Sequence, residues 1–201
     1  NDFSQKLLND ENKYLVLNSE DDLKGLPQQL KDAAASQAIA RKTNGKWIIV
    51  NTRSSVDPFL TYSERRDLRE KVWKMFINRG DNGDENDTNA IIPEILQLRV
   101  ERAKLLGYPT HAHFRLAVAM AKTPENAMDL MLGVWKPAVA RVHEEVADMQ
   151  ALANKEGAKI TIEPWDYKFY MEKVRKAKYD LDQNEVKPYL QLDKLREGMF
   201  Y

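Results

Sequence analysis

The segment from Thr123 to about Glu156 constrains the fold most, because it predicts one very long helix. Thr123 is a capping residue, Pro124 suits the first helical position, and Glu125 faces the positive end of the helix dipole. Pro137 lies inside this segment, so we expect a kink there. A chain that carries such a helix is expected to be mainly α.

The other predicted elements are also mostly helical. Residues 1–24 suit a docking helix and a short extended piece from Tyr14 to Leu17. Apolar spacing, caps and prolines predict further helices over about 27–41, 63–79, 90–106, 111–121 and from 166 onward, with a break near Pro188. In three of these helices, Ser63, Thr110 and Asp166 are the expected N-caps. β-branched and aromatic residues predict a strand over 46–52 after the turn Asn44-Gly45, and a shorter strand over 159–162. The sequence therefore predicts a mainly α fold with one or two short strands.

Composition limits the classes of function. The 201 residues fit one domain, residues 1–201, and their net charge is zero, so no overall field draws the chain to nucleic acid or to an anionic membrane. Cysteine is absent, which excludes disulfides, a thiol nucleophile and thiolate metal ligands. No apolar run approaches the ~20 residues of a membrane helix. The compartment stays open between cytoplasm and periplasm.

Both ends of the sequence suggest a larger parent protein. The first residue is Asn1, and no signal peptide follows it. The last four residues, from Gly198 to Tyr201, are mostly apolar, whereas natural termini are more often polar. We therefore expect the chain to have been processed or cut from something longer.

The three histidines do not form a zinc motif. A peptidase of the H-E-x-x-H kind needs two histidines at i and i+4 on one helical face. The nearest match begins at His143, but Ala147 occupies the position of the second ligand. His111 and His113 point in different directions on a helix, so they cannot share a metal. The sequence also contains no phosphate-binding loop and no nucleophile elbow. We predict no catalytic, cofactor-binding or metal-ligating residue in this chain.

An acidic loop and an aromatic cluster each allow two interpretations. Residues 78–89 have a glycine, Gly83, at the turn position of a calcium-binding EF-hand loop, but Gly80 and Asn89 stand where ligands are required, which favours a solvated turn. Tyr167 and Tyr170 lie three residues apart, so both phenols could line a peptide groove. The alternative, which we favour, is that these aromatic residues pack a helix junction.

Six segments, in order along the chain, resemble the thimet oligopeptidase family of zinc metallopeptidases, and most closely its bacterial peptidyl-dipeptidase and oligopeptidase A branches. The likeness covers nearly the whole chain. Its segments are Asp22 to Pro27, Trp47 to Val50, Arg66 to Glu70 with Arg79-Gly80, Ile91 to Pro109, Met120 to Glu125, and Pro164 to Tyr170. The last carries Phe169-Tyr170 where the family usually has two tyrosines.

The resemblance implies a helical ellipsoid split by a deep channel, with zinc on one wall. The segment Pro164 to Tyr170 contains Trp165-Asp166, and we call it the Trp-Asp element. The family's H-E-x-x-H helix lies C-terminal to this element, and this chain reaches Tyr201 without such a helix. We therefore expect a non-catalytic scaffold and channel-wall portion, upstream of the zinc-binding segment, of an enzyme that hydrolyses short peptides. Its expected partners are those peptides and the missing C-terminal half of the same polypeptide, and zinc belongs to the parent enzyme. The alternative is a free-standing helical module that binds peptides without catalysis.

Overall fold

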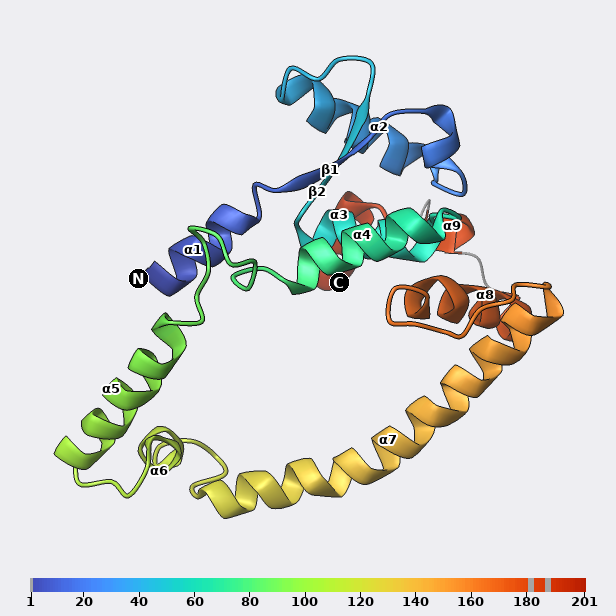
Figure 1. Cartoon of the computed structure of the whole chain (residues 1–201). Coiled ribbons are helices and arrows are strands. Elements are labelled where there is room, and N and C mark those ends of the chain that lie inside the picture. The colour runs from blue at the N-terminus through green and yellow to red at the C-terminus, as the bar shows by residue number, and fades with distance from the viewer. Residues whose placement is uncertain (1, 181–182, 187–188) are drawn as a thin grey trace.

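The computed structural model describes residues 2–180, 183–186 and 189–201, and this part of the chain is mainly helical (Figure 1). The helices are α1 (Asp2–Asp10), α2 (Gln28–Ala40), α3 (Arg53–Tyr62), α4 (Arg66–Ile77), α5 (Ile91–Leu105), α6 (His111–Leu116), α7 (Pro124–Lys155), α8 (Tyr167–Tyr179), α9 (Gln183–Val186) and α10 (Leu192–Met199). A short 3₁₀ helix spans Glu20–Leu23. The two strands are β1 (Tyr14–Leu17) and β2 (Trp47–Val50). The predicted fold class is confirmed.

The sheet and its neighbouring helices enclose the larger hydrophobic core. β1 and β2 pair antiparallel, with Tyr14 opposite Val50 and Leu17 opposite Trp47. Helix α2 packs on β2, and α3 packs on both β2 and α4. The fully buried Phe59 of α3 lies in this core with nine other buried residues, namely Leu17, Leu23, Leu26, Ala34, Ile49, Val56, Leu60, Leu68 and Val72.

Helix α7 is the longest element and has the predicted start. The Thr123 hydroxyl accepts a hydrogen bond from the Asn126 N–H, and Pro124 occupies the first turn. Its 32 residues make it about 48 Å long. The helix continues through Pro137 without a break, and Figure 1 shows a gradual bend along its length. With α5 and α6 it forms an arc that leads away from the sheet and returns at α8.

Two predicted details around α4 are wrong. Ser63 is not an N-cap: it follows α3, and α4 begins only at Arg66 after Arg65. The predicted helix over 63–79 is therefore shorter. Helix α3 was not among the predicted elements, and it contains Pro58, although proline normally interrupts helical hydrogen bonding.

The predicted strand over 159–162 is also wrong. Among the described residues, this segment pairs with no strand. Instead, the Gln150 side chain of α7 donates to the Ile160 carbonyl at 2.8 Å and accepts from the Ile162 N–H at 3.0 Å. A side-chain amide thus takes the place of a neighbouring strand. Helix α6 has the predicted Thr110 cap but ends at Leu116 rather than near 121.

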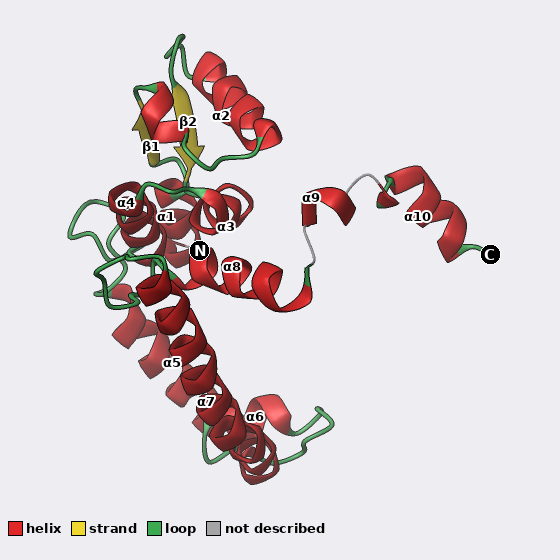
Figure 2. Ribbon diagram, turned by 90° about the vertical axis from the view of Figure 1, so that its right-hand side faces the viewer, coloured by secondary structure: helices red, strands yellow, loops and turns green. Residues whose placement is uncertain are grey.

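Helices α9 and α10 stand apart from α8 (Figure 2). Residues of α10 are exposed, including Leu192 and Met199. The predicted break at Pro188 lies outside the described residues. Within the described ranges, no helix combines the length and apolar character needed to cross a membrane.

Candidate functional site

A buried carboxylate joins α4 to the start of α8. Asp166 is buried and accepts hydrogen bonds from Arg66 Nε at 3.0 and 3.1 Å and from Arg66 Nη2 at 2.9 Å. Arg69 Nη2 donates to Asp166 Oδ1 at 2.7 Å. Asp166 holds the predicted N-cap position, but its side chain makes no cap hydrogen bond, because it is engaged by these two arginines. We call Arg66, Arg69 and Asp166 the arginine clamp.

The clamp also holds the backbone and the aromatic residues around it. Arg69, itself buried, donates to the carbonyls of Ser63 at 2.7 Å and Trp165 at 3.2 Å. Its guanidinium lies 4.2 Å from the centre of the Phe169 ring, a cation–π distance. Trp165 in turn makes an edge-to-face contact with Trp73 of α4. Hydrogen bonding to Asp166 raises the pKa of Arg66. The clamp thus fixes the Trp-Asp element rigidly on α4.

Next to the clamp lies an apolar hollow, which we call the α7–α8 pocket. Its volume is about 440 Å³. It is lined by Leu60 of α3, Trp73 of α4, Val142 and Val146 of α7, Ile162, Glu163 and Pro164 of the connecting loop, and Tyr167 and Lys168 of α8. Because its walls are mainly apolar, this pocket suits a hydrophobic side chain rather than a charged group.

The two tyrosines of the aromatic cluster have different surroundings. Tyr167 lines the α7–α8 pocket, and its hydroxyl donates to Glu145 Oε2 at 3.1 Å. Tyr170 is buried against Met149 and Ala153 of α7. Burial raises the pKa of both phenols, so both stay protonated near neutral pH. The packing interpretation accounts for Tyr170, while Tyr167 also borders the hollow.

Replacing Tyr167 with phenylalanine is expected to lower the free energy of unfolding by about 1 kcal/mol, because it removes one partly buried hydrogen bond to Glu145. Urea unfolding followed by circular dichroism measures this difference. Tyr179→Phe, at an exposed tyrosine of the same helix, is the control. An equal effect at both positions would mean that the bond to Glu145 contributes nothing.

The histidines lie apart from this pocket. His143 is exposed on α7, followed by Glu144 and Glu145, both paired with Arg141. In α6, the hydroxyl of Thr110 lies 2.8 Å from His113 Nδ1. Burial, with nearby arginines, lowers the pKa of His111. Within residues 2–180, 183–186 and 189–201, no three His, Asp or Glu side chains are grouped so that they could hold a metal. The donors present do not fit a zinc site.

Two lysines bind the acidic loop, residues 78–89, through hydrogen bonds and an ion pair. Lys6 Nζ donates to the carbonyls of Glu85 and Asp87 at 2.9 and 3.0 Å, and Lys13 pairs with Asp84 at 2.5 Å. Ammonium groups from α1 and the turn after it therefore bind oxygens of this acidic loop. This arrangement makes the loop a structural connection to α1.

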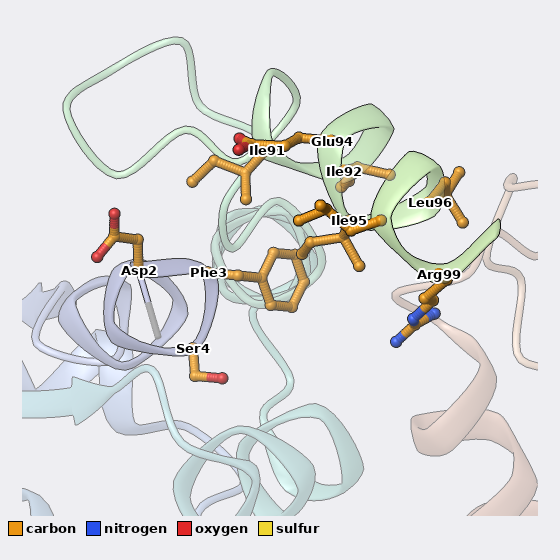
Figure 3. A pocket seen from close by; sticks show the side chains of 10 residues that line it. Asp2, Phe3, Ser4, Ile91, Ile92, Glu94, Ile95, Leu96 and Arg99 are labelled. Carbon is orange, nitrogen blue, oxygen red and sulfur yellow. The ribbon is translucent and has the colours of Figure 1, made fainter. Parts of the chain in front are cut away.

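A second hollow lies between α1 and α5, with a volume of about 880 Å³ (Figure 3). Phe3 of α1 points toward Ile95 of α5, and Ile92 and Leu96 project from the same helix. Ile92 and Leu96, which also line this hollow, are exposed. The hollow is open and contains no grouping of catalytic side chains.

The sequence interpretation missed most of the α7–α8 pocket, because its walls come from four separate segments. One signal was available. Val142 and Val146 are four residues apart, so they share a face of a helix that was correctly predicted. The residues of the site limit what it can do chemically. It can accept an apolar group, hold that group in position and exclude water from it. It has no nucleophile with an adjacent base.

The sequence profile of Peptidase family M3 matches residues 59–201, and the chain belongs to this family. The predicted resemblance is therefore confirmed.

Individual relatives support the same assignment. The chain is 36% identical over 201 residues to the dipeptidyl carboxypeptidase of Escherichia coli strain K12, a match that covers 99% of this chain and 30% of the relative. It is 32% identical over 207 residues to the organellar oligopeptidase A of Arabidopsis thaliana, covering 98% of this chain and 26% of that protein. It is 31% identical over 189 residues to oligopeptidase A of Salmonella typhimurium, a match that covers 92% of this chain and 28% of that protein. The chain thus spans less than a third of the length of these relatives.

Proposed function

We propose that this chain forms scaffold and part of the channel wall of a zinc metallopeptidase that hydrolyses short peptides, as a peptidyl-dipeptidase or an oligopeptidase. One observation carries the proposal: almost the whole chain matches 30% of a dipeptidyl carboxypeptidase, while its own residues contain no H-E-x-x-H sequence. In this proposal, zinc is held by a part of the polypeptide outside these 201 residues.

The clamp and the long helix give the chain the properties that a wall needs. Asp166 fixes the start of α8 on α4, and α8 packs along the end of α7. Such a wall keeps its shape without a bound substrate, so it can admit extended short peptides and exclude folded proteins. The chain contributes positioning and exclusion, and no proton transfer or metal binding is assigned to it.

The purified chain is expected to hydrolyse no short peptide above the buffer rate, even with added zinc, because its sequence contains no H-E-x-x-H motif. A fluorogenic peptide assay checks this. In a second experiment, this chain replaces the corresponding 30% of the E. coli dipeptidyl carboxypeptidase. We expect the hybrid enzyme to retain peptide hydrolysis. Chelator-sensitive cleavage by the purified chain alone would contradict the proposal.

The free-standing binding module makes a different prediction. A finished module should be a monomer that binds peptides and little apolar dye, whereas a portion of a larger enzyme should expose apolar surface. Many large apolar residues of α5 and α7 are exposed, including Leu98 and Trp135. This exposure favours a portion of a larger enzyme over a free-standing binding module. Saturable binding of a short peptide by a dye-negative monomer would support the module instead.

A further inference from the structure

Helix α7 carries one continuous apolar stripe. Apart from the adjacent pair Met131 and Leu132, its members recur every three or four residues, and all of them lie on one face of the helix. They are Met128, Met131, Leu132, Trp135, Val139, Val142, Val146, Met149 and Ala153. We call these residues the α7 stripe.

Among the described residues, burial of the α7 stripe is greatest at its C-terminal end. Met149 is 2% exposed and Ala153 is fully buried, because both pack against Tyr170 and its neighbours in α8. Toward the N-terminus the cover ends: Leu132 is 56% exposed and Trp135 is 67% exposed. The same face of the same helix is therefore an interior surface at one end and a bare surface at the other.

The α7–α8 pocket lies where the cover ends. Val142 and Val146 of the stripe form one wall, while Trp73 and Pro164 stand among the residues facing them. The bare part of the stripe thus runs into an open hollow with mainly apolar walls. A helix laid along α7 could place apolar residues against the stripe at helical spacing and its terminal side chain in the pocket.

We propose that the bare part of the α7 stripe, from Met128 to Val142, binds an amphipathic helix from the part of the polypeptide outside these 201 residues. Two observations choose this occupant. The stripe continues an interface that already binds a helix, α8. The relatives are more than three times as long as the matched segment, so additional chain is available to cover it. This inference rests on the proposed function, because it requires a larger parent enzyme.

Cysteine labelling tests the proposal, and the natural absence of cysteine makes the chain suitable for it. Leu132→Cys is compared with Leu130→Cys, which is 72% exposed and lies roughly 200° around the helix. Each variant is prepared as the free chain and within the E. coli dipeptidyl carboxypeptidase in place of its matched segment, with any cysteine in the rest of that enzyme replaced. The measurement is the rate of reaction with a maleimide.

We expect Leu132→Cys to react at least tenfold more slowly in the large enzyme than in the free chain, and Leu130→Cys to change less than twofold. Equal rates at position 132 in both settings would overturn the proposal. Slow labelling of position 132 in the free chain that speeds up on dilution would also overturn it, because a second copy would then cover the stripe. Protection without peptide hydrolysis would keep the docking helix and reject the proposed function.

A measurement on the free chain does not depend on the hybrid enzyme folding. Leu132→Lys should leave the thermal midpoint unchanged, since its site is bare, whereas Met149→Lys should abolish cooperative unfolding. A loss of cooperativity with Leu132→Lys would show that the stripe is already covered within the free chain, and would overturn the proposal.

Discussion

Replacing Asp166 with alanine is expected to lower the free energy of unfolding of the chain by about 3–5 kcal/mol. The substitution removes the carboxylate that accepts from both Arg66 and Arg69. Arg69 is buried and would keep its charge without a counter-ion. The cost of a buried, unpaired guanidinium exceeds that of the lost hydrogen bonds themselves.

Urea unfolding at neutral pH, followed by circular dichroism, measures the effect. Glu144→Ala is the control, because Glu144 is exposed and pairs with Arg141 at the surface of α7, where ion pairs contribute little. The control should leave the midpoint unchanged. If Asp166→Ala were as mild as the control, the clamp would not be what fixes α8 on α4.

The arginine clamp shows which features of Asp166 the neighbouring sequence predicts and which it does not. Asp166 was predicted as the N-cap of a helix, and that helix does begin at Tyr167. Its side chain, however, bonds to arginines about 100 residues earlier in the chain. Capping follows from neighbouring residues, whereas a long-range ion pair depends on how the helices meet. The pattern therefore predicted the position of Asp166 and missed its contacts.

The errors in secondary structure have a similar origin. The segment 159–162 has the residues of a strand, but its Ile160 carbonyl and Ile162 N–H bond to the side chain of Gln150 of α7. Propensity describes the segment, while its partner is set by packing. In α3, packing of Val56 and Phe59 into the core outweighs the disruption expected from Pro58.

The family could be predicted from ordered segments, but the candidate site could not. Trp73 and Val142 line the same pocket although nearly 70 residues separate them. Neither residue carries a titratable group or belongs to a motif, so no pattern singles it out. Apolar pockets arise from the arrangement of helices, and only the stripe spacing on α7 pointed toward this one.

A second buried carboxylate, Asp10 at the end of α1, links that helix to the acidic loop. Its Oδ2 accepts from the Gly80 N–H at 2.7 Å and from Asn82 Nδ2 at 2.9 Å, and Oδ1 lies 2.7 Å from Lys13 Nζ. Gly80 has φ +74°, and a Cβ there would lie 2.6 Å from a Leu7 methyl group, so the loop needs glycine at this contact. Asp10 is thus the acceptor around which the loop closes.

We expect Asp10→Asn to lower the free energy of unfolding by about 2–3 kcal/mol near neutral pH, because an uncharged amide cannot replace a carboxylate that accepts from Gly80, Asn82 and Lys13. Burial alone would raise the pKa of Asp10, but the hydrogen bonds from Gly80, Lys13 and Asn82 together hold it below its ordinary value of 3.8. A carboxyl whose pKa is lower in the folded state stabilises the fold above its unfolded pKa. That stabilisation disappears as the pH falls through the folded pKa.

The difference in unfolding free energy between the natural chain and Asp10→Asn should therefore be constant from about pH 7 to pH 5 and shrink below about pH 4. Urea unfolding across this range measures it. Asp81→Asn, at an exposed carboxylate of the same loop, should give a small difference that changes little with pH. A difference for Asp10→Asn that stayed constant down to pH 2 would show that its carboxylate charge is not what holds the loop. In that case the loop would depend on shape and on the lysine contacts to its backbone carbonyls.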